Sequence, residues 1–308
     1  MSTPSNNSHI KNERKTVVNR LTWALIITIA IFLLELFGGF LSNSLSLKSD
    51  AAHLFGDVLA LGLSYIAARL ALLPPSSKRT FGYHRAEVLA AVFNGVTLFL
   101  LAGYIFFEAY HRFLNPQPIK SGIMFIVALI GLAGNLYVIF KLHSFSKENL
   151  NVRAAYLHII GDMLGSVGVV AGSLIIILTG SFIADPIISV FIAIIIIYGA
   201  FSILIEGANI LLEGTPLSIN YKELKSDIEK IAGITSVHDL HVWTISSSNL
   251  ILTAHIKIDD QPIHNSNQIL TSINSLVQDK YGIRHTTIQS ECGCCQDQPC
   301  GCDTIADN

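Results

Sequence analysis

The chain of 308 residues has 14% charged and 51% hydrophobic residues and a formal net charge of −2. A soluble globular domain carries about 25% charged residues, so this composition fits neither a soluble domain nor a disordered chain. The near-neutral charge gives no basic field for nucleic acid, and no nucleic-acid partner is expected. The sequence also lacks the Walker motif and H-E-x-x-H, the usual markers of ATP hydrolysis and of zincin proteases.

Six stretches are apolar and long enough to cross a membrane, which takes about 20 residues. They cover residues 21–41, 50–73, 86–113, 121–141, 154–179 and 184–206. Residues 1–20 form a polar N-terminal tail that is too long, and too poor in small residues at its end, for a signal peptide. The sequence therefore predicts an α-helical membrane domain over residues 21–212.

Lys and Arg residues divide unevenly between the two sides of the predicted spans. The N-terminal tail and the loops after the second and fourth spans carry ten, and the opposite side carries three, Lys48, Arg112 and Lys120. Because positively charged loops stay in the cytoplasm, both termini are expected there. In a bacterium this multi-pass protein would lie, surrounded by membrane lipid, in the inner cell membrane.

Hydropathy falls at Glu213, and residues 213–291 have the patterns of a small folded domain. Helical spacing occurs in residues 218–232 and 264–281, and strand patterns occur in residues 236–246, 250–258 and 284–290. In the second strand, apolar residues alternate with polar ones such as His255. The order helix-strand-strand-helix-strand predicts a cytosolic α+β domain.

All five cysteines lie in the last segment, residues 292–308. They are Cys292, Cys294, Cys295, Cys300 and Cys302. An odd, crowded set without partners elsewhere in the chain indicates reduced thiols that bind soft metals. The first three follow the last predicted strand directly, so we expect them to add thiolates to a cytosolic metal site.

The pattern H-x-x-x-D occurs in two predicted spans, as His53 with Asp57 and as His158 with Asp162. Positions i and i+4 share one face of a helix, so each His lies one turn from its Asp. A charged group at mid-membrane costs about 2.5–3.5 kcal/mol on insertion scales. A divalent cation held by two imidazoles and two carboxylates would offset that cost.

This predicted ligand set indicates which ions would bind. Four nitrogen and oxygen ligands suit tetrahedral Zn²⁺, whereas Mg²⁺ and Ca²⁺ prefer six or more oxygens. Cd²⁺ and Co²⁺ also fit, because ligand type discriminates weakly among these ions. The sequence therefore does not rank Zn²⁺ against Cd²⁺ or Co²⁺.

Other interpretations of the membrane residues remain open. Each pair could be a buried His–Asp hydrogen bond between packed helices. Asp57 and Asp162 could be the acid pair of an intramembrane aspartyl protease, although the G-x-G-D signature is matched only in part and leaves both His unexplained. A metal-binding membrane regulator without transport is a further alternative. Glu35 is unusual at its depth, and Asp50 could guide ions to the site or cap its helix.

Histidines of the C-terminal domain form a second candidate metal group. His238 and His255 lie on successive predicted strands and could converge. The sequence does not decide whether His241 and His264 also bind metal. A His on a strand face is more often a plain surface residue, but the nearby cysteines favour metal binding.

Together these motifs resemble the cation diffusion facilitator family, proton-coupled exporters of Zn²⁺ and related ions. The resemblance is carried by the two H-x-x-x-D pairs, by R-T-F-G-Y-H-R-A-E before the third span, and by S-V-H-D-L-H-V-W in the cytosolic domain. The two-His, two-Asp set is similar to that of the zinc and cadmium branch. The resemblance implies six membrane helices, a cytosolic metallochaperone-like domain and a homodimer.

The resemblance also implies roles for residues outside the transport site. The family's cytosolic metal site maps onto His238, His255 and Glu291. Arg85 and Glu213 fall where the family has an ion pair near the dimer interface. In the loop before the third span, Ser76, Arg79 and Tyr83 stand where some members bind a further metal ion, so we expect no site there.

The expected function is efflux of Zn²⁺, and also of Cd²⁺ or Co²⁺, by antiport with protons. The His side chains must be neutral to bind metal, so metal displaces protons, and their ordinary pKa of about 6.5 suits that exchange. Zn²⁺ is expected both as substrate and as regulatory ligand of the cytosolic domain. Neither a cofactor nor enzyme activity is expected, and the proton stoichiometry does not follow from the sequence.

Overall fold

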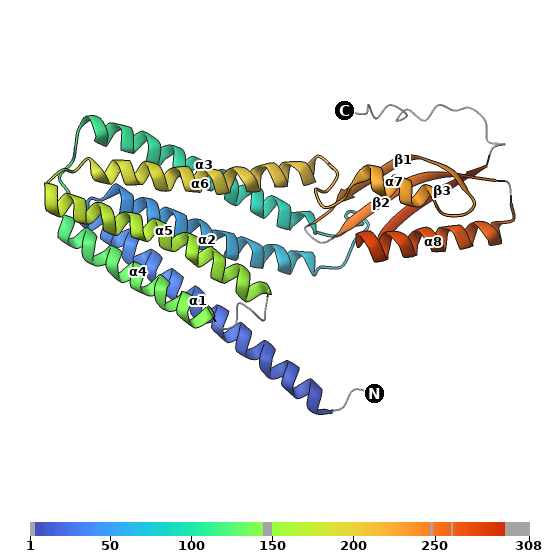
Figure 1. The fold of residues 1–308 in the computed structure, drawn as a ribbon, viewed down its shortest axis with the longest axis horizontal. Helices are drawn as coiled ribbons and strands as arrows, with labels where there is room; N and C mark the ends of the chain where they lie inside the picture. The colour runs from blue at the N-terminus through green and yellow to red at the C-terminus, as the bar shows by residue number, and fades with distance from the viewer. Residues whose placement is uncertain (1–3, 144–149, 247–248, 260, 293–308) are drawn as a thin grey trace. The chain divides into compact units, whose positions relative to one another are not determined.

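The computed structural model describes residues 4–143, 150–246, 249–259 and 261–292 (Figure 1). The chain divides into two compact units. The first contains residues 1–62 and 93–202, and the second contains residues 63–92 and 203–308.

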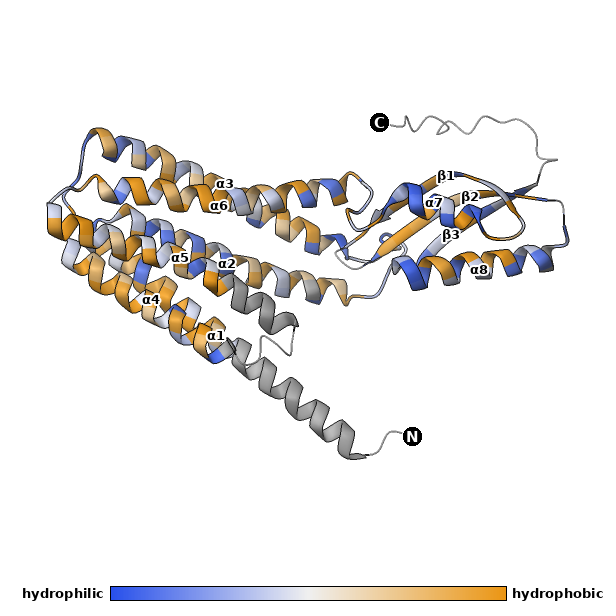
Figure 2. Cartoon of the chain, viewed as in Figure 1, coloured by the Kyte–Doolittle hydropathy of each residue, from blue (hydrophilic) through white to orange (hydrophobic). Residues whose placement is uncertain are grey.

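The first six elements of the described chain are long helices. They are α1 (Pro4–Ser42), α2 (Leu45–Ala71), α3 (Arg85–Leu114), α4 (Ser121–His143), α5 (Leu150–Thr179) and α6 (Ala184–Leu211). Each contains a segment long and apolar enough to cross a membrane, and hydrophobic residues dominate α3 to α6 in Figure 2. The six predicted spans are confirmed on length and composition.

Helix α1 reaches further toward the N-terminus than the predicted span. It begins at Pro4 rather than near residue 21. Proline is favoured in the first turn of a helix, and residues 5–20 contain neither glycine nor proline. The helix therefore continues beyond its apolar part.

Close packing of α1 against α4 depends on glycine. A Cβ added at Gly38 would lie 2.6 Å from Val127, and one at Gly134 would lie 2.7 Å from Ile31. Both separations are shorter than real carbon contacts, so larger residues would push the helices apart. This packing sets the position of Glu35, which lies on α1 between the two contacts.

The N-terminus of α2 is held by Asp185 from the start of α6. The carboxylate accepts hydrogen bonds from the backbone N–H groups of Leu45 (2.7 Å) and Ser46 (3.0 Å), two donors that a helix start leaves open. Because α2 begins at Leu45, Asp50 lies inside the helix. The interpretation of Asp50 as a helix cap is therefore wrong.

The C-terminal domain has the predicted order of elements. They are α7 (Tyr221–Glu229), β1 (Ile234–Thr244), β2 (Leu250–Ile258), α8 (Ile263–Tyr281) and β3 (His285–Cys292). In the sheet β1-β2-β3, β1 runs antiparallel to β2, and β3 runs parallel to β2. The predicted α+β fold is confirmed, with boundaries shifted by a few residues.

One face of β2 forms the core of this domain. Leu252 and Ile256 are fully buried with Ile228 of α7 and Ile273 of α8. Because side chains alternate along a strand, His255 points to the opposite face. The helices thus leave that face of the sheet free for polar side chains.

Candidate metal centres

The membrane site joins residues of α2 and α5. His53 Nε2 lies 3.3 Å from Asp162 Oδ1, and one ligand atom from each of His53, Asp57 and Asp162 lies within 4.8 Å of the others. Asp162 is buried and His53 is partly exposed. Three of the four predicted transport ligands are therefore close enough to hold one ion.

The fourth predicted ligand is His158. It occupies α5 one helical turn before Asp162, but its side chain lies outside the described part of the structure. The spacing of four residues between His158 and Asp162 is the basis of this prediction. Its part in the site remains a prediction.

A glycine within the first H-x-x-x-D pair brings α2 against α3. A Cβ added at Gly56 would collide with the side chain of Leu98. Leu98 belongs to the buried core of the first unit, together with Leu47 of α2 and Val169 of α5. Gly56 therefore lets α2 approach its neighbours closely while His53 and Asp57 turn toward α5.

Asp50 does not join the group of three ligands. Its Oδ2 accepts a hydrogen bond from Ser166 Oγ at 3.1 Å, and Asn135 Nδ2 donates to the same hydroxyl at 3.3 Å. Ser166 and Asn135 carry no motif in the sequence, and only the packing of α2, α4 and α5 reveals their contacts.

The cytosolic site joins all three strands. Glu291 at the end of β3 contacts two imidazoles, with Oε2 3.1 Å from His238 Nε2 and Oε1 2.9 Å from His255 Nδ1. The two rings lie edge to face with centroids 5.4 Å apart. One ligand atom from each of the three residues lies within 4.8 Å of the others.

Strand register explains this convergence. His238 on β1 pairs with His255 on β2, and His255 pairs with Gln289 on β3. Glu291 lies two residues beyond Gln289, so its side chain points to the same face of the sheet. Two imidazoles and a carboxylate within this distance suit Zn²⁺.

Asp239 is an additional carboxylate at this site that the sequence analysis missed. Its Oδ1 lies 2.9 Å from His241 Nε2, and its Oδ2 lies 3.6 Å from His255 Nε2. The β1–β2 register shifts between His238 and His241, and Asp239 has φ +49°. Asp is one of the residues that tolerate this conformation, and the irregularity turns Asp239 toward the histidines.

Three predicted ligands, all cysteines, are not placed, and neither is His264, whose role the sequence left open. The side chains of His264 and Cys292 lie outside the described part of the structure, as do Cys294 and Cys295. Cys292 is the last residue of β3, directly after Glu291. The prediction that the cysteines join the cytosolic site is therefore untested.

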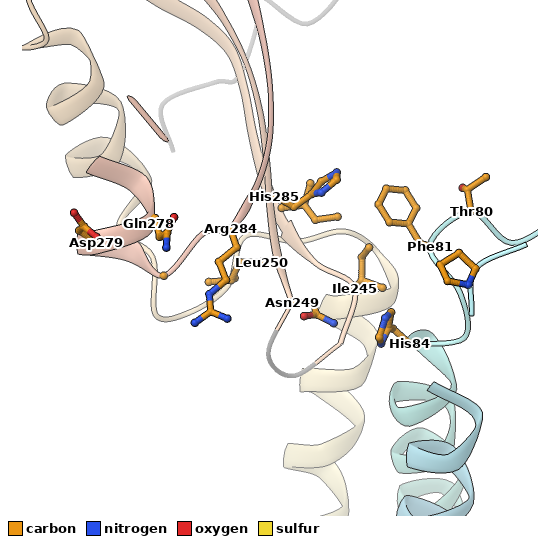
Figure 3. Close-up of a pocket in the computed structure, with 13 residues that line it drawn as sticks. Thr80, Phe81, His84, Ile245, Asn249, Leu250, Gln278, Asp279, Arg284 and His285 are labelled. Atoms are coloured by element: carbon orange, nitrogen blue, oxygen red, sulfur yellow. The ribbon is translucent and has the colours of Figure 1, made fainter. Parts of the chain in front are cut away.

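The second unit also contains a cavity of about 770 Å³, shown in Figure 3. Its lining includes Phe81 and His84 from the segment before α3, and His285 from β3. The rings of Phe81 and His285 lie 5.6 Å apart. Among the described residues, the two groups with three metal ligands lie elsewhere, so we assign no metal to this cavity.

Neighbouring residues of the second unit form two further contacts. Arg85 Nη2 lies 2.9 Å from Glu213 Oε1, which is the pairing that the family resemblance implied. The Arg79 guanidinium lies 4.4 Å from the centre of the Tyr83 ring. The Arg79 side chain therefore stacks on an aromatic ring, and neither residue is an ordinary metal ligand.

Comparison with known proteins gives consistent matches over the chain. Residues 21–212 match the family model of the cation efflux transmembrane domain, and residues 216–292 match that of the cation efflux protein cytoplasmic domain. The chain is 40% identical over 289 residues to a "Cadmium, cobalt and zinc/H(+)-K(+) antiporter" of Bacillus velezensis, with 93% of this chain and 91% of the relative covered.

Two further relatives have similar coverage. The zinc transporter ZitB of Shigella flexneri is 38% identical over 295 residues, which cover 95% of this chain and 93% of the relative. The metal cation efflux system protein CzcD of Cupriavidus metallidurans is 40% identical over 273 residues, which cover 89% of this chain and 86% of the relative.

Proposed function

The chain belongs to the cation diffusion facilitator family, and we propose that it exports Zn²⁺ and related divalent cations from the cytoplasm in exchange for protons. Cd²⁺ and Co²⁺ are the further substrates, in line with the names of the relatives. The six membrane-capable helices fit a multi-pass transporter.

The observation that carries this proposal is the meeting of His53, Asp57 and Asp162 across two helices. Nitrogen and carboxylate donors are the ligands that Zn²⁺ takes in proteins, and His158 would complete a set of four. An aspartyl protease would have no use for an imidazole 3.3 Å from one of its acids.

Protons can replace the metal at the same atoms. Metal binding requires neutral imidazole and ionised carboxylate, so an arriving ion displaces protons. When the ion leaves, a proton on His53 restores a positive charge beside Asp162, at the 3.3 Å separation already present. Alternating access to the two sides of the membrane then couples metal export to proton entry.

The cytosolic site regulates transport in this proposal. Binding of Zn²⁺ by His238, His255 and Glu291, with thiolates from Cys292, Cys294 and Cys295, would hold a homodimer in its active form. In this proposal both termini lie in the cytoplasm, which the uneven distribution of Lys and Arg supports. The regulatory ion is therefore drawn from the compartment that supplies the substrate.

Uptake of metal into everted membrane vesicles tests this function. We expect an imposed pH gradient to drive accumulation of Zn²⁺, Cd²⁺ and Co²⁺, and Asp162→Ala to abolish it while the protein stays in the membrane. A wild-type protein that binds Zn²⁺ without moving it would be a membrane regulator and would contradict the proposal.

A further inference from the structure

A second group of buried polar side chains lies near the proposed transport site. It consists of Glu35 on α1, Asp50 on α2, Asn135 on α4 and Ser166 on α5, which are 0%, 2%, 3% and 1% exposed. All four belong to the first compact unit. We refer to them as the oxygen cluster, because each contributes a side-chain oxygen.

Hydrogen bonds link three of the four residues of the oxygen cluster. Asn135 donates to Ser166, and Ser166 donates to Asp50. By contrast, neither carboxylate oxygen of Glu35 has a hydrogen-bond partner among the described residues. A buried polar group in this state calls for a ligand or proton.

The charged side chains that face the oxygen cluster are mostly acidic. Glu35 experiences the charges of Asp50 from α2 and Asp162 from α5, and Asp50 experiences those of His53 and Asp162. The residue of α4 that lies against the Glu35 carboxylate is Gly131, which has no side chain. Asp50 therefore has His53 and Ser166 as favourable neighbours, whereas the charged groups that act on Glu35 are both acidic.

Two glycines make room for these carboxyl groups. A Cβ added at Gly131 on α4 would collide with Oε1 of Glu35, and one at Gly165 on α5 would lie 2.6 Å from Oδ1 of Asp50. Gly122, on the same helix as Gly131, has no atom within 4 Å of an added Cβ. A larger residue would therefore crowd Glu35 at position 131 but would meet no atom at position 122.

A divalent ion at the transport site does not compensate this charge. Its two positive charges match the carboxylates of Asp57 and Asp162, so Glu35 and Asp50 are left over. Buried charges need pairing with an opposite charge, and oxygen donors suit hard cations rather than soft metals.

We propose that the oxygen cluster binds the monovalent cation, H⁺ or K⁺, that is exchanged for the divalent metal. The inference rests on the proposed antiport. Both cations are named as counter-ions of a 40% identical relative, and either one would neutralise a carboxylate of Glu35 or Asp50. Binding at the oxygen cluster and release of the metal are then linked through the transport ligands, because the charge of Asp162 acts on Glu35 and Asp50 and that of His53 acts on Asp50.

The test uses the full-length protein in liposomes and two assays. The first is exchange of labelled for unlabelled Cd²⁺ at equal pH and equal K⁺, which needs the transport site but no counter-ion gradient. The second is Cd²⁺ uptake driven either by a pH gradient at equal K⁺ or by a K⁺ gradient at equal pH. The gradient that drives the wild type identifies the coupling cation.

We expect Glu35→Gln to keep exchange within about twofold and to lower gradient-driven uptake by about tenfold, within the 5–150-fold range usual for coupled sites. Gly131→Ala should act in the same direction by crowding Glu35. Gly122→Ala, the same chemical change on the same helix, should leave both assays unchanged.

Two results would overturn this inference. Gradient-driven uptake by Glu35→Gln at the wild-type rate would show that the oxygen cluster binds no coupling cation. An equal loss of exchange and uptake in Glu35→Gln and Gly131→Ala would mean that Glu35 serves the metal site or the fold. A wild-type protein that exchanges Cd²⁺ but responds to neither gradient would instead refute the proposed antiport.

Discussion

The two candidate metal sites use similar ligands on different scaffolds. In the membrane site, two helices supply His53, Asp57 and Asp162, of which Asp162 is buried and His53 is 24% exposed. In the cytosolic site, three strands supply His238, His255 and Glu291, whose side chains are 31%, 21% and 29% exposed. The same ligand chemistry is thus placed once on helices that are apolar enough to cross a membrane and once on the polar face of a sheet.

This difference in scaffold is the basis of the two roles that we propose. Removing an ion from a buried site leaves charge that the hydrocarbon cannot solvate, so its release must be coupled to the arrival of another cation. At a half-exposed site water can solvate the empty ligands, so occupancy can follow the free metal concentration. The first arrangement suits transport and the second suits sensing.

The strongest way to break this comparison is to remove a membrane ligand. Asp57→Ala should lower Zn²⁺ flux by more than about 100-fold, because losing even a residue that only supports a ligand costs about 10–100-fold. Flux into everted vesicles measures the effect, with unchanged Zn²⁺ binding by the cytosolic site as control. Near-normal flux would show that the metal crosses elsewhere.

A change of ligand type should alter the selectivity of the membrane site. His53→Asp gives a set richer in oxygen, so Mn²⁺ should gain on Zn²⁺ by about tenfold in relative flux. The vesicle assay with a panel of ions gives this ratio. An unchanged Zn²⁺:Cd²⁺:Mn²⁺ ratio would argue that His53 is not a ligand.

Removing a ligand from the cytosolic site should change the metal concentration at which transport is activated, rather than the maximal flux. His255→Ala removes the imidazole that contacts both Glu291 and Asp239. The metal concentration for half-maximal flux should rise by about tenfold, with flux at saturating metal retained. A dose–response curve measures both quantities, and loss of saturating flux would place this site on the transport path.

The smallest expected effect concerns the scaffold of the cytosolic domain. Hydrogen bonds from Lys280, Tyr281 and Lys230 hold the pKa of Asp227 well below its usual range. A lowered pKa in the folded state stabilises the fold at neutral pH, and this contribution disappears as the pH falls and Asp227 becomes protonated.

Lys280→Met should therefore speed hydrogen exchange of α7 and α8 a few-fold at pH 7. The difference from wild type should shrink at pH values below about 4, the ordinary pKa of Asp. Lys225→Met on α7 is the control and should have no such effect. A difference that persisted at acid pH would indicate a packing effect rather than the ion pair.

Most of the fold follows from the length of apolar stretches and from periodic patterns in the sequence. Apolar length fixed the six spans, and alternation along residues 250–258 placed His255 opposite the buried Leu252. The spacing of His53 and Asp57 on one helix turn is likewise visible in the sequence. A contact between α2 and α5 brings His53 and Asp57 to Asp162. This contact was predicted only because one metal ion would need ligands from both helices.

Features that depend on helix rotation or on strand irregularity could not be predicted. Ser166 and Asn135 are ordinary small polar residues until the packing of α4 and α5 directs them to Asp50. Asp239 reaches the cytosolic histidines through a shift in strand register. Neither kind of contact leaves a periodic trace in the sequence.

The most direct test of two sites with separate roles counts bound Zn²⁺ and measures flux on the same samples. Wild type, Asp57→Ala and His255→Ala are purified at full length, equilibrated with Zn²⁺ and reconstituted. We predict that each variant binds one ion fewer per chain than wild type, and that only Asp57→Ala loses flux at saturating metal. Loss of flux in His255→Ala, or full metal binding by Asp57→Ala, would contradict this account.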